Sequence, residues 1–290
     1  MTSSPFSGGA QGRGPRLEAG AQPAGWIDSH AHITAQEFDA DRAAMLERAW
    51  AAGLETIVAI GAGYGVEHNA EAPALAAKNP RVVATVGVHP HDAAAWGQQA
   101  CARVRAWLEL PGVVALGECG LDYHYMRAPR EIQRRAFAEQ VSLAREKRLP
   151  VSIHVRGDDA RAYDDLLEIW EREGRGDTTG VLHCYTGTLE FARRAIARQL
   201  LISFSGILTF KRDRGLREVA AELPLSALLV ETDAPLLSPE GFRGRRNEPC
   251  HVVRVGEVLA ALQGVGVETV AKVTAANARR LFRLVEGAAR

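Results

Sequence analysis

Six residues that can bind a divalent cation each stand at or near the end of a short apolar run. His30 and His32 lie two apart in W-I-D-S-H-A-H-I. Side chains two apart on a strand point to the same face, so both imidazoles can bind one ion. The other four are Glu118 in A-L-G-E-C-G, His154 in V-S-I-H-V, His183 in V-L-H-C-Y and Asp233 in L-V-E-T-D-A-P. Six such ligands are too many for one tetrahedral site, but they suit two divalent metal ions that share a carboxylate and a water.

The apolar runs that carry these residues belong to a repeating pattern of strands and helices. Strand-like runs are expected at 26–33, 54–61, 82–89, 113–119, 150–155, 180–185, 200–206 and 227–233. Apolar residues recur at helical spacing over 39–52, 129–148, 160–173, 189–198, 251–262 and 267–285. Strands alternating with helices in this way predict an α/β fold, a (β/α)₈ TIM barrel of the metal-dependent hydrolase type.

The predicted barrel places all six candidate ligands at one rim. They fall near the C-terminal ends of the first, fourth, fifth, sixth and eighth expected strands. Barrel enzymes carry their catalytic residues on that rim. The fold prediction and the metal-site prediction therefore support each other.

Composition favours one catalytic domain behind a polar leader. Residues 1–25 are rich in Gly, Ser, Pro and Gln and have no apolar periodicity, which predicts a disordered N-terminal tail. Residues 26–290 suit a single barrel domain. A chain that starts at Gly25 is therefore expected to match the full chain in melting temperature, metal content and reaction rate.

Charge and cysteine usage narrow the class of protein further. Lys plus Arg and Asp plus Glu both number 35, so no global positive field indicates a nucleic-acid binder, although one face can still be basic. The four cysteines form no C-x-x-C pair, and no run of eighteen apolar residues or secretory leader occurs. These features favour a cytoplasmic monomer that does not enter a membrane.

Residues that follow the strand ends are candidates for substrate binding. His89, Asp122 and His124 stand on expected rim loops, where each could contact substrate or hydrogen-bond within its loop, and Arg156 follows the fifth strand. Basic loops after strands seven and eight carry Lys211, Arg212 and Arg214, and then Arg243, Arg245 and Arg246. In a chain of zero net charge, this local enrichment favours an anionic substrate such as phosphate.

Taken together and in this order, the motifs make the chain resemble the TatD family of metal-dependent deoxyribonucleases, which are amidohydrolase-like barrels. The resemblance covers about Ile27 to Phe282 and rests on D-S-H-A-H, G-V-H-P-H, G-E-C-G-L-D-Y, I-H-V-R, H-C-Y-T-G, S-F-S-G-I-L-T-F-K, E-T-D-A-P and R-N-E-P. The N-terminal tail is extra, and His124 occupies a position that varies in the family. Neither departure touches a predicted ligand.

The resemblance implies hydrolysis of DNA phosphodiester bonds, often as a 3′→5′ exonuclease, with two divalent ions. Mg²⁺ or Mn²⁺ is expected in function, with Zn²⁺ as an alternative. It implies that one ion is held by His30, His32 and Asp233 and the other by His154 and His183, with Glu118 bridging them. In some relatives Glu231 would take part in a further ion.

The expected reaction is attack of an activated water on the phosphodiester. A divalent ion lowers the pKa of a bound water from about 15.7 towards about 7. Asp233 is the expected proton acceptor, so Asp233 and the bridging Glu118 are the predicted catalytic residues. Single-stranded ends suit a deep barrel mouth, where Tyr123, Tyr125 or Phe210 could stack a base.

Two other functions remain open on the same barrel. A small-molecule amide hydrolase or deaminase can use the same ligand set, although the basic rim loops and the E-T-D-A-P segment argue against it. A protein that binds without catalysis would usually have lost at least one ligand, whereas all six are present.

Overall fold

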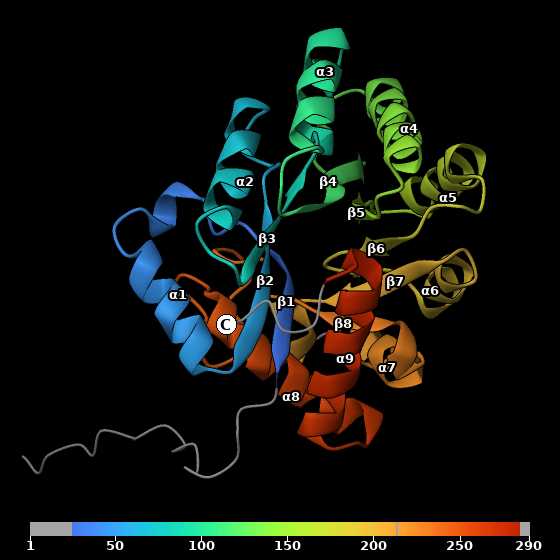
Figure 1. Ribbon diagram of the computed structural model, residues 1–290. Helices are drawn as coiled ribbons and strands as arrows, with labels where there is room; N and C mark the ends of the chain where they lie inside the picture. The colour runs from blue at the N-terminus through green and yellow to red at the C-terminus, as the bar shows by residue number, and fades with distance from the viewer. Residues whose placement is uncertain (1–24, 213, 285–290) are drawn as a thin grey trace, which may run out of the picture.

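Eight parallel strands form the centre of the structure, a computed structural model that describes residues 25–212 and 214–284. The strands are β1 (Trp26–Ala31), β2 (Leu54–Ile60), β3 (Val82–Val86), β4 (Val113–Asp122), β5 (Val151–Arg156), β6 (Gly180–Leu182), β7 (Leu200–Phe204) and β8 (Leu228–Val230). Each pairs in parallel with the next, in the order β1-β2-β3-β4-β5-β6-β7-β8. Figure 1 shows the helices standing around these strands, so the predicted (β/α)₈ barrel is confirmed.

A helix follows every strand. The α-helices are α1 (Arg42–Ala51), α2 (Glu71–Ala76), α3 (Gln98–Trp107), α4 (Arg130–Lys147), α5 (Arg161–Gly174), α6 (Leu189–Ile196), α7 (Arg214–Glu222), α8 (Val252–Gln263) and α9 (Val267–Phe282). Short 3₁₀ helices are η1 (Gln36–Phe38), η2 (Glu67–Ala70), η3 (Pro90–Ala95), η4 (Gly206–Thr209), η5 (Leu225–Ala227) and η6 (Pro249–His251). The helices α2, α3 and α7 complete the alternation where the sequence pattern named no helix.

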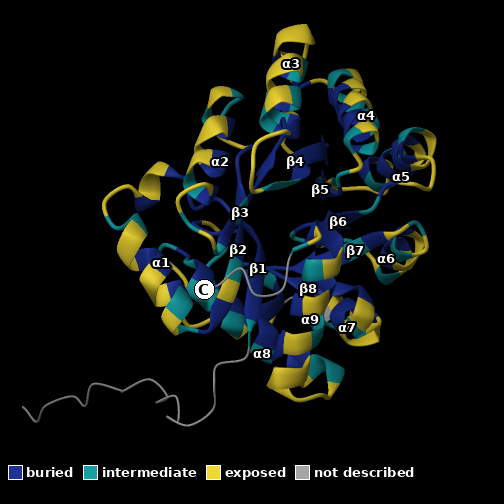
Figure 2. Cartoon of the chain, in the orientation of Figure 1, coloured by how far each residue is buried: buried dark blue, intermediate teal, exposed yellow. Residues whose placement is uncertain are grey.

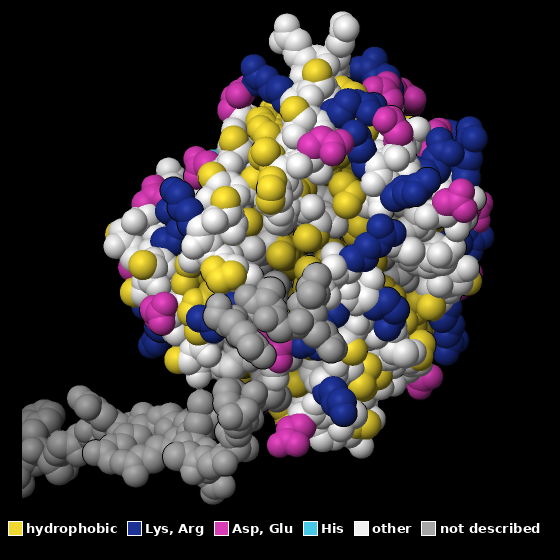
Figure 3. Space-filling view, viewed as in Figure 1, with side chains coloured by type: hydrophobic (Ala, Val, Ile, Leu, Met, Phe, Trp, Pro, Cys, Tyr) yellow, Lys and Arg dark blue, Asp and Glu magenta, His cyan; other side chains and the backbone are white. Residues whose placement is uncertain are grey.

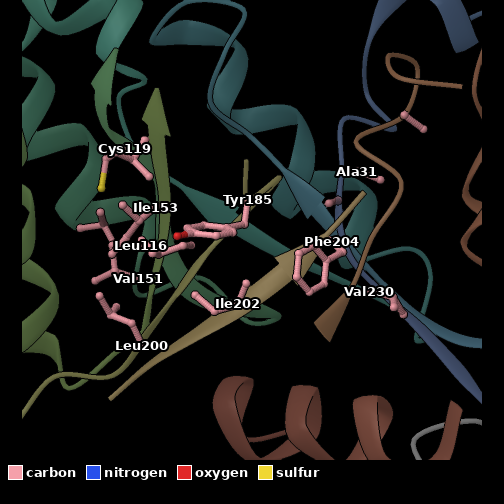
Figure 4. Packing of buried hydrophobic residues seen from close by; sticks show 14 of the residues in the cluster. Ala31, Leu116, Cys119, Val151, Ile153, Tyr185, Leu200, Ile202, Phe204 and Val230 are labelled. Carbon is pink, nitrogen blue, oxygen red and sulfur yellow. The ribbon is translucent and has the colours of Figure 1, made fainter. Parts of the chain in front are cut away.

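The core has an outer and an inner layer. The outer layer packs the strands against the helices, and Figure 4 shows part of it, with Leu116 close to Ile153 and with Ile202 and Phe204 farther along. The inner layer combines strand residues with α9 residues: Ile27, Val58, Ile60, Ala62, Ala115, Val181, Leu229, Ala275, Ala278, Leu281 and Phe282. Figure 2 shows the resulting pattern, with buried strands and helices that are exposed mainly on their outer sides.

The barrel closes between β1 and β8 through the segment that follows β8. The backbone N–H of Asp233 donates to the carbonyl of His30 over 2.9 Å, and the N–H of His32 donates to the carbonyl of Ala234 over 2.7 Å. The buried Asp28 carboxylate accepts from the Thr232 N–H at 2.9 Å. These bonds tie two candidate ligands from opposite ends of the chain to one another.

Gly117 and Gly120 allow β4 to approach β5 closely on both sides of Glu118. Their φ angles are +141° and +144°, and a Cβ on either residue would clash with a backbone carbonyl of β5. These glycines therefore permit the close approach of two strands, which places Glu118 beside His154.

We expect Gly120→Ala to destabilise the barrel by about 2–6 kcal/mol. About 1–3 kcal/mol comes from the positive φ and about 1–3 kcal/mol from the clash of the new methyl group with the carbonyl of His154. Urea unfolding measures the change. Gly97→Ala is the control, because Gly97 has an extended φ of −166° and a Cβ there meets no atom within 4 Å. Equal stability of both variants would contradict the prediction.

Basic and acidic side chains are interspersed over the face seen in Figure 3.

Within the described part of the chain, no single helix is long and apolar enough to cross a membrane. The segments Pro249–Gln263 and Val267–Phe282, bent by 110° to one another, are together long and apolar enough by length and composition alone. Apart from Gly25, the tail predicted over residues 1–25 lies outside the described residues.

Candidate metal centre

The structure brings the six predicted ligands together at the carboxyl end of the barrel. His30, Glu118 and His154 stand on β1, β4 and β5. The other three come just after a strand: His32 after β1, His183 after β6 and Asp233 after β8. All are buried except His154, which is intermediate. Because parallel strands end at one rim, residues up to two hundred positions apart become neighbours.

Glu118 lies between two groups of imidazoles, and each of its oxygens faces one group. Its Oε2 is 3.4 Å from Nε2 of His30 and 3.6 Å from Nε2 of His32. Its Oε1 is 2.7 Å from Nε2 of His183 and 3.1 Å from Nδ1 of His154. Glu118 is thus shared by two half-sites. The first half-site contains His30 and His32, and the second contains His154 and His183. Asp233 belongs to the first half-site, where its Oδ1 lies 3.5 Å from Nε2 of His32.

The donor set fits a divalent cation. The buried Nε2 of His30 faces the carboxylates of Glu118 and Asp233 and has no hydrogen-bond partner among the described residues. Donor atoms lie within 4.8 Å of one another in three groups: His30 with His32 and Asp233, His30 with His183 and Glu231, and His89 with Glu118 and His154. Imidazole nitrogens and carboxylate oxygens together suit ions such as Zn²⁺, Mn²⁺ and Mg²⁺.

The buried carboxylates and imidazoles of the centre shift one another's pKa values. Burial by itself would raise the pKa of Glu118, but the neighbouring His183 and His89 hold that pKa well below its usual value. Burial would likewise lower the pKa of His183, but the Glu118 carboxylate holds it well above its usual value. A cation that enters here competes with the proton on His183, so acid conditions oppose metal binding.

His89 both caps its loop and contacts the centre. Its Nδ1 accepts from the N–H of His91 at 3.1 Å, at the start of η3. The proton must therefore lie on Nε2, which is 3.2 Å from Oε1 of Glu118. Burial lowers the pKa of His89 to about 4, so the ring is neutral. Of the two roles that the sequence left open for His89, the structure shows the loop cap, and contact with substrate stays a prediction.

Asp122 organises the second half-site, a role that sequence reasoning missed. Its Oδ2 accepts from Nε2 of His154 and Nε2 of His91, each at 3.0 Å, and its Oδ1 accepts from the N–H of Tyr125 at 2.8 Å. Burial would raise the pKa of Asp122, but the bonds from His154 and His91 hold it well below its usual value. The proton of His154 therefore lies on Nε2, which leaves Nδ1 free for a cation. The available signal was the spacing, because Asp122 stands four residues after Glu118 on one strand.

We expect Asp122→Asn to weaken metal binding about 10–100-fold, as loss of an outer partner of a metal-ligating histidine typically does. The carboxamide NH₂ cannot accept a hydrogen bond, so His154 loses the group that fixes its proton. Competition with a chelator of known affinity measures the effect. Asp177→Asn, an exposed change between α5 and β6, is the control. Unchanged affinity of the Asp122 variant would refute the orienting role.

A cavity of about 670 Å³ opens above the centre. Its lining includes the predicted substrate contacts His89 and Arg156, but neither His124 nor Arg243. The ring of His124 instead contacts Asp158, with 2.6 Å between Nδ1 and Oδ1. Arg243 lies with its guanidinium 4.2 Å from the centre of the Phe210 ring. The structure thus divides the four candidates into two inside the cavity and two outside it.

The sequence suggested that the basic loop after β8 binds an anionic substrate, but the structure pairs Arg246 of this loop with carboxylates of the protein. The guanidinium of Arg246 pairs with Asp41 at 2.7 Å and with Glu248 at 3.0 Å. Its charge therefore anchors the loop to the start of α1. A contact between residues 205 positions apart could not be read from local sequence.

Two of the three aromatic residues predicted to stack a base, Tyr123 and Phe210, do not line the cavity. Tyr123 is 6% exposed, and its hydroxyl donates to Asp165 over 2.7 Å. Phe210 carries Arg243 on its ring. Tyr125 is 52% exposed and lines the cavity. Adjacent strand residues point to opposite faces, which explains how Tyr123 lies outside the site that Asp122 enters.

The chain is similar to known proteins over almost the whole barrel. The chain matches the family described as "TatD related DNase" over residues 27–283. The uncharacterized metal-dependent hydrolase YabD of Bacillus subtilis is 38% identical over 258 residues, or 89% of this chain and 99% of that protein. The 3'-5' ssDNA/RNA exonuclease TatD of Cronobacter sakazakii is 38% identical over 261 residues, or 88% of this chain and 97% of that protein.

A solved structure shows the same architecture. The crystal structure of YJJV, a TatD homolog from Escherichia coli K12, matches with a TM-score of 0.82 and 32% identity. The match covers 90% of this chain and 98% of that one. Sequence and structure thus agree over the whole barrel.

Proposed function

The chain belongs to the TatD-related DNase family of metal-dependent hydrolases, and on that premise we propose that it is a 3′→5′ exonuclease that cleaves DNA phosphodiester bonds at single-stranded ends. The observation that carries the proposal is the position of Glu118. One buried carboxylate faces two imidazole pairs at the floor of an open cavity. Two ions about 3.5–4 Å apart are the usual arrangement in nucleases and phosphatases.

The proposed cofactor is a pair of divalent ions, Mg²⁺ or Mn²⁺ in function, with Zn²⁺ as an alternative. The residues that would hold them are His30, His32 and Asp233 for one ion and His154 and His183 for the other, with Glu118 shared between them. When bound, the ions would lower the pKa of a water and offset negative charge on the phosphate. The donor atoms of His30, His32 and Asp233, which lie within 4.8 Å of one another, support the first assignment. The second is supported by Oε1 of Glu118, which lies 2.7 Å from His183 and 3.1 Å from His154.

The protein's own residues would supply proton transfer and positioning. Burial would raise the pKa of Asp233, but the hydrogen bond from His32 lowers it, so the carboxylate is ionised and able to accept a proton at neutral pH. Arg156 is exposed at the cavity wall, where it can bind a phosphate oxygen. The neutral His89 and the ionised Asp122 hold Glu118 and His154 in place.

Single-stranded ends fit the cavity better than a duplex does. The predicted ligands lie on the cavity floor, where Glu118 is 2% and Asp233 is 8% exposed. A strand end can reach down to them, whereas the phosphates of a rigid duplex cannot. All six predicted ligands come from one chain, so we also propose that the protein acts as a monomer, which sedimentation would test. We further propose that it acts in the cytoplasm, which cell fractionation would test.

Metal-titrated hydrolysis of 5′-labelled single-stranded DNA tests the proposal. The expected products shorten one nucleotide at a time from the 3′ end, and EDTA abolishes them. A matched RNA strand measures the preference for DNA. Much shorter labelled products that appear before products one or two nucleotides shorter would overturn the exonuclease assignment. Turnover of cyclic amides without any DNA cleavage would favour the alternative of a small-molecule amide hydrolase or deaminase.

We expect Arg156→Ala to make DNA binding less sensitive to salt. Each lost phosphate contact on a single strand lowers the slope of log K against log salt by about 0.7. Arg246→Ala should leave the slope unchanged, because its guanidinium is already paired with Asp41 and Glu248. Fluorescence anisotropy of a labelled strand over a NaCl series measures both. The same slope for wild type and Arg156→Ala would show that Arg156 does not contact phosphate.

A further inference from the structure

Three exposed apolar side chains line the cavity above the metal centre. Seven large apolar side chains are exposed among the described residues, and Tyr64, Tyr125 and Leu236 are the ones that line this cavity. They follow β2, β4 and β8 respectively. Exposed apolar side chains gathered around one cavity indicate a binding surface.

Tyr125 is held in place at the second half-site. Its N–H donates to Asp122, the carboxylate that orients His154. Its ring lies edge-to-face with His91, with 5.5 Å between ring centres, and the guanidinium of Arg156 lies 4.8 Å from the centre of the ring. The aromatic surface and the candidate phosphate-binding arginine are therefore neighbours.

Tyr64 occupies the corresponding place at the first half-site. Its ring packs edge-to-face on His32, with 5.6 Å between ring centres, and 40% of the residue is exposed. Gly63 has φ +103°, and a Cβ on it would lie 3.2 Å from the His32 ring, so the loop that carries Tyr64 fits closely over this histidine.

We propose that Tyr64 and Tyr125 stack the nucleobases next to the phosphate that is cleaved, one ring at each half of the metal centre. This inference rests on the proposed nuclease function. Tyr64 contacts the predicted ligand His32 directly. Tyr125 is linked to the predicted ligand His154 through Asp122, which accepts from the N–H of Tyr125 and from the ring of His154. Every base has a π-face, so stacking would bind a strand end with little dependence on its sequence.

Removal of either the ring or the base tests the proposal. We would compare a single strand with the same strand lacking the bases of its two 3′-terminal nucleotides. Loss of one stacked base corresponds to about 5- to 150-fold, so Tyr64→Ala and Tyr125→Ala should each lower kcat/KM on the normal strand by that factor. Their effect on the abasic strand should be small. Tyr64→Phe and Tyr125→Phe should retain the wild-type rate, because the ring remains.

A control variant and a second readout separate stacking from a structural role. Leu110→Ala removes a similarly exposed apolar side chain outside the cavity and should change neither strand's kinetics. Metal content should stay unchanged in the two Tyr→Ala variants, since neither residue is a predicted ligand. Binding of a labelled strand with phosphorothioate linkages at its 3′ end should weaken by the same factor as kcat/KM.

The outcomes distinguish this inference from the nuclease proposal. If wild type cleaves normal and abasic strands equally well, stacking is refuted and the nuclease function stands. If wild type cleaves neither strand with any divalent ion, the nuclease function fails, and the binding comparison decides on stacking. Equal affinity of wild type and the Tyr→Ala variants for the normal strand would then overturn the inference.

Discussion

Replacing Asp233 by Asn is expected to lower kcat by about 10²–10⁴-fold, the usual cost of losing a general base, while most of the bound metal stays in place. The physical reason is that the two proposed roles of Asp233, metal ligand and proton acceptor, are separable. Five other predicted ligands, Glu118 among them, still surround the site, whereas the Asn carboxamide cannot accept the proton of the attacking water. Stopped assays with Mg²⁺ and Mn²⁺ give kcat, and elemental analysis of the same samples gives metal content.

The matched control for this variant is Asp177→Asn, an exposed position between α5 and β6. It makes the same chemical change far from the cavity and should leave both readouts at their wild-type values. A near-normal kcat for Asp233→Asn would show that another group accepts the proton. Complete loss of metal from this variant would show that the ion, rather than the base, accounts for the effect.

Glu118→Gln is expected to lower metal content and kcat together. The two oxygens of Glu118 face different imidazole groups, at 2.7 Å from His183 and 3.4 Å from His30. A carboxamide offers one oxygen and an NH₂ group that has no lone pair for a cation, so at least one half-site loses its shared ligand. The fall should exceed the about 10–100-fold that loss of an outer partner costs.

Elemental analysis and kcat again measure the result, with the exposed Glu268→Gln on α9 as the control. Two metal ions per chain at wild-type kcat would contradict a bridging role for Glu118. The two variants also differ from each other in a useful way. Asp233→Asn should separate rate from metal content, whereas Glu118→Gln should not, and that contrast distinguishes a proton acceptor from a bridging ligand.

Much of the fold and the location of the site follow from local sequence patterns. Apolar runs of strand length alternate with helical periodicity, and this alternation predicts a parallel barrel. Once the barrel is assumed, a residue at the end of a run must lie at the common rim. The amino-acid sequence alone therefore places His30, Glu118, His154, His183 and Asp233 together, because the position of each depends only on its neighbours in the chain.

Only the tertiary structure decided how these residues are oriented and which neighbours serve them. The sharing of Glu118 between two half-sites, the bonds that Asp122 accepts from His154 and His91, and the pairing of Arg246 with Asp41 all join segments that are distant in the chain. Tyr123 and Tyr125 look alike in sequence, yet Tyr123 is buried against Asp165 and Tyr125 lines the cavity. Periodicity specifies the face and the end of an element, whereas hydrogen-bond partners and exposure depend on what the other elements place opposite it.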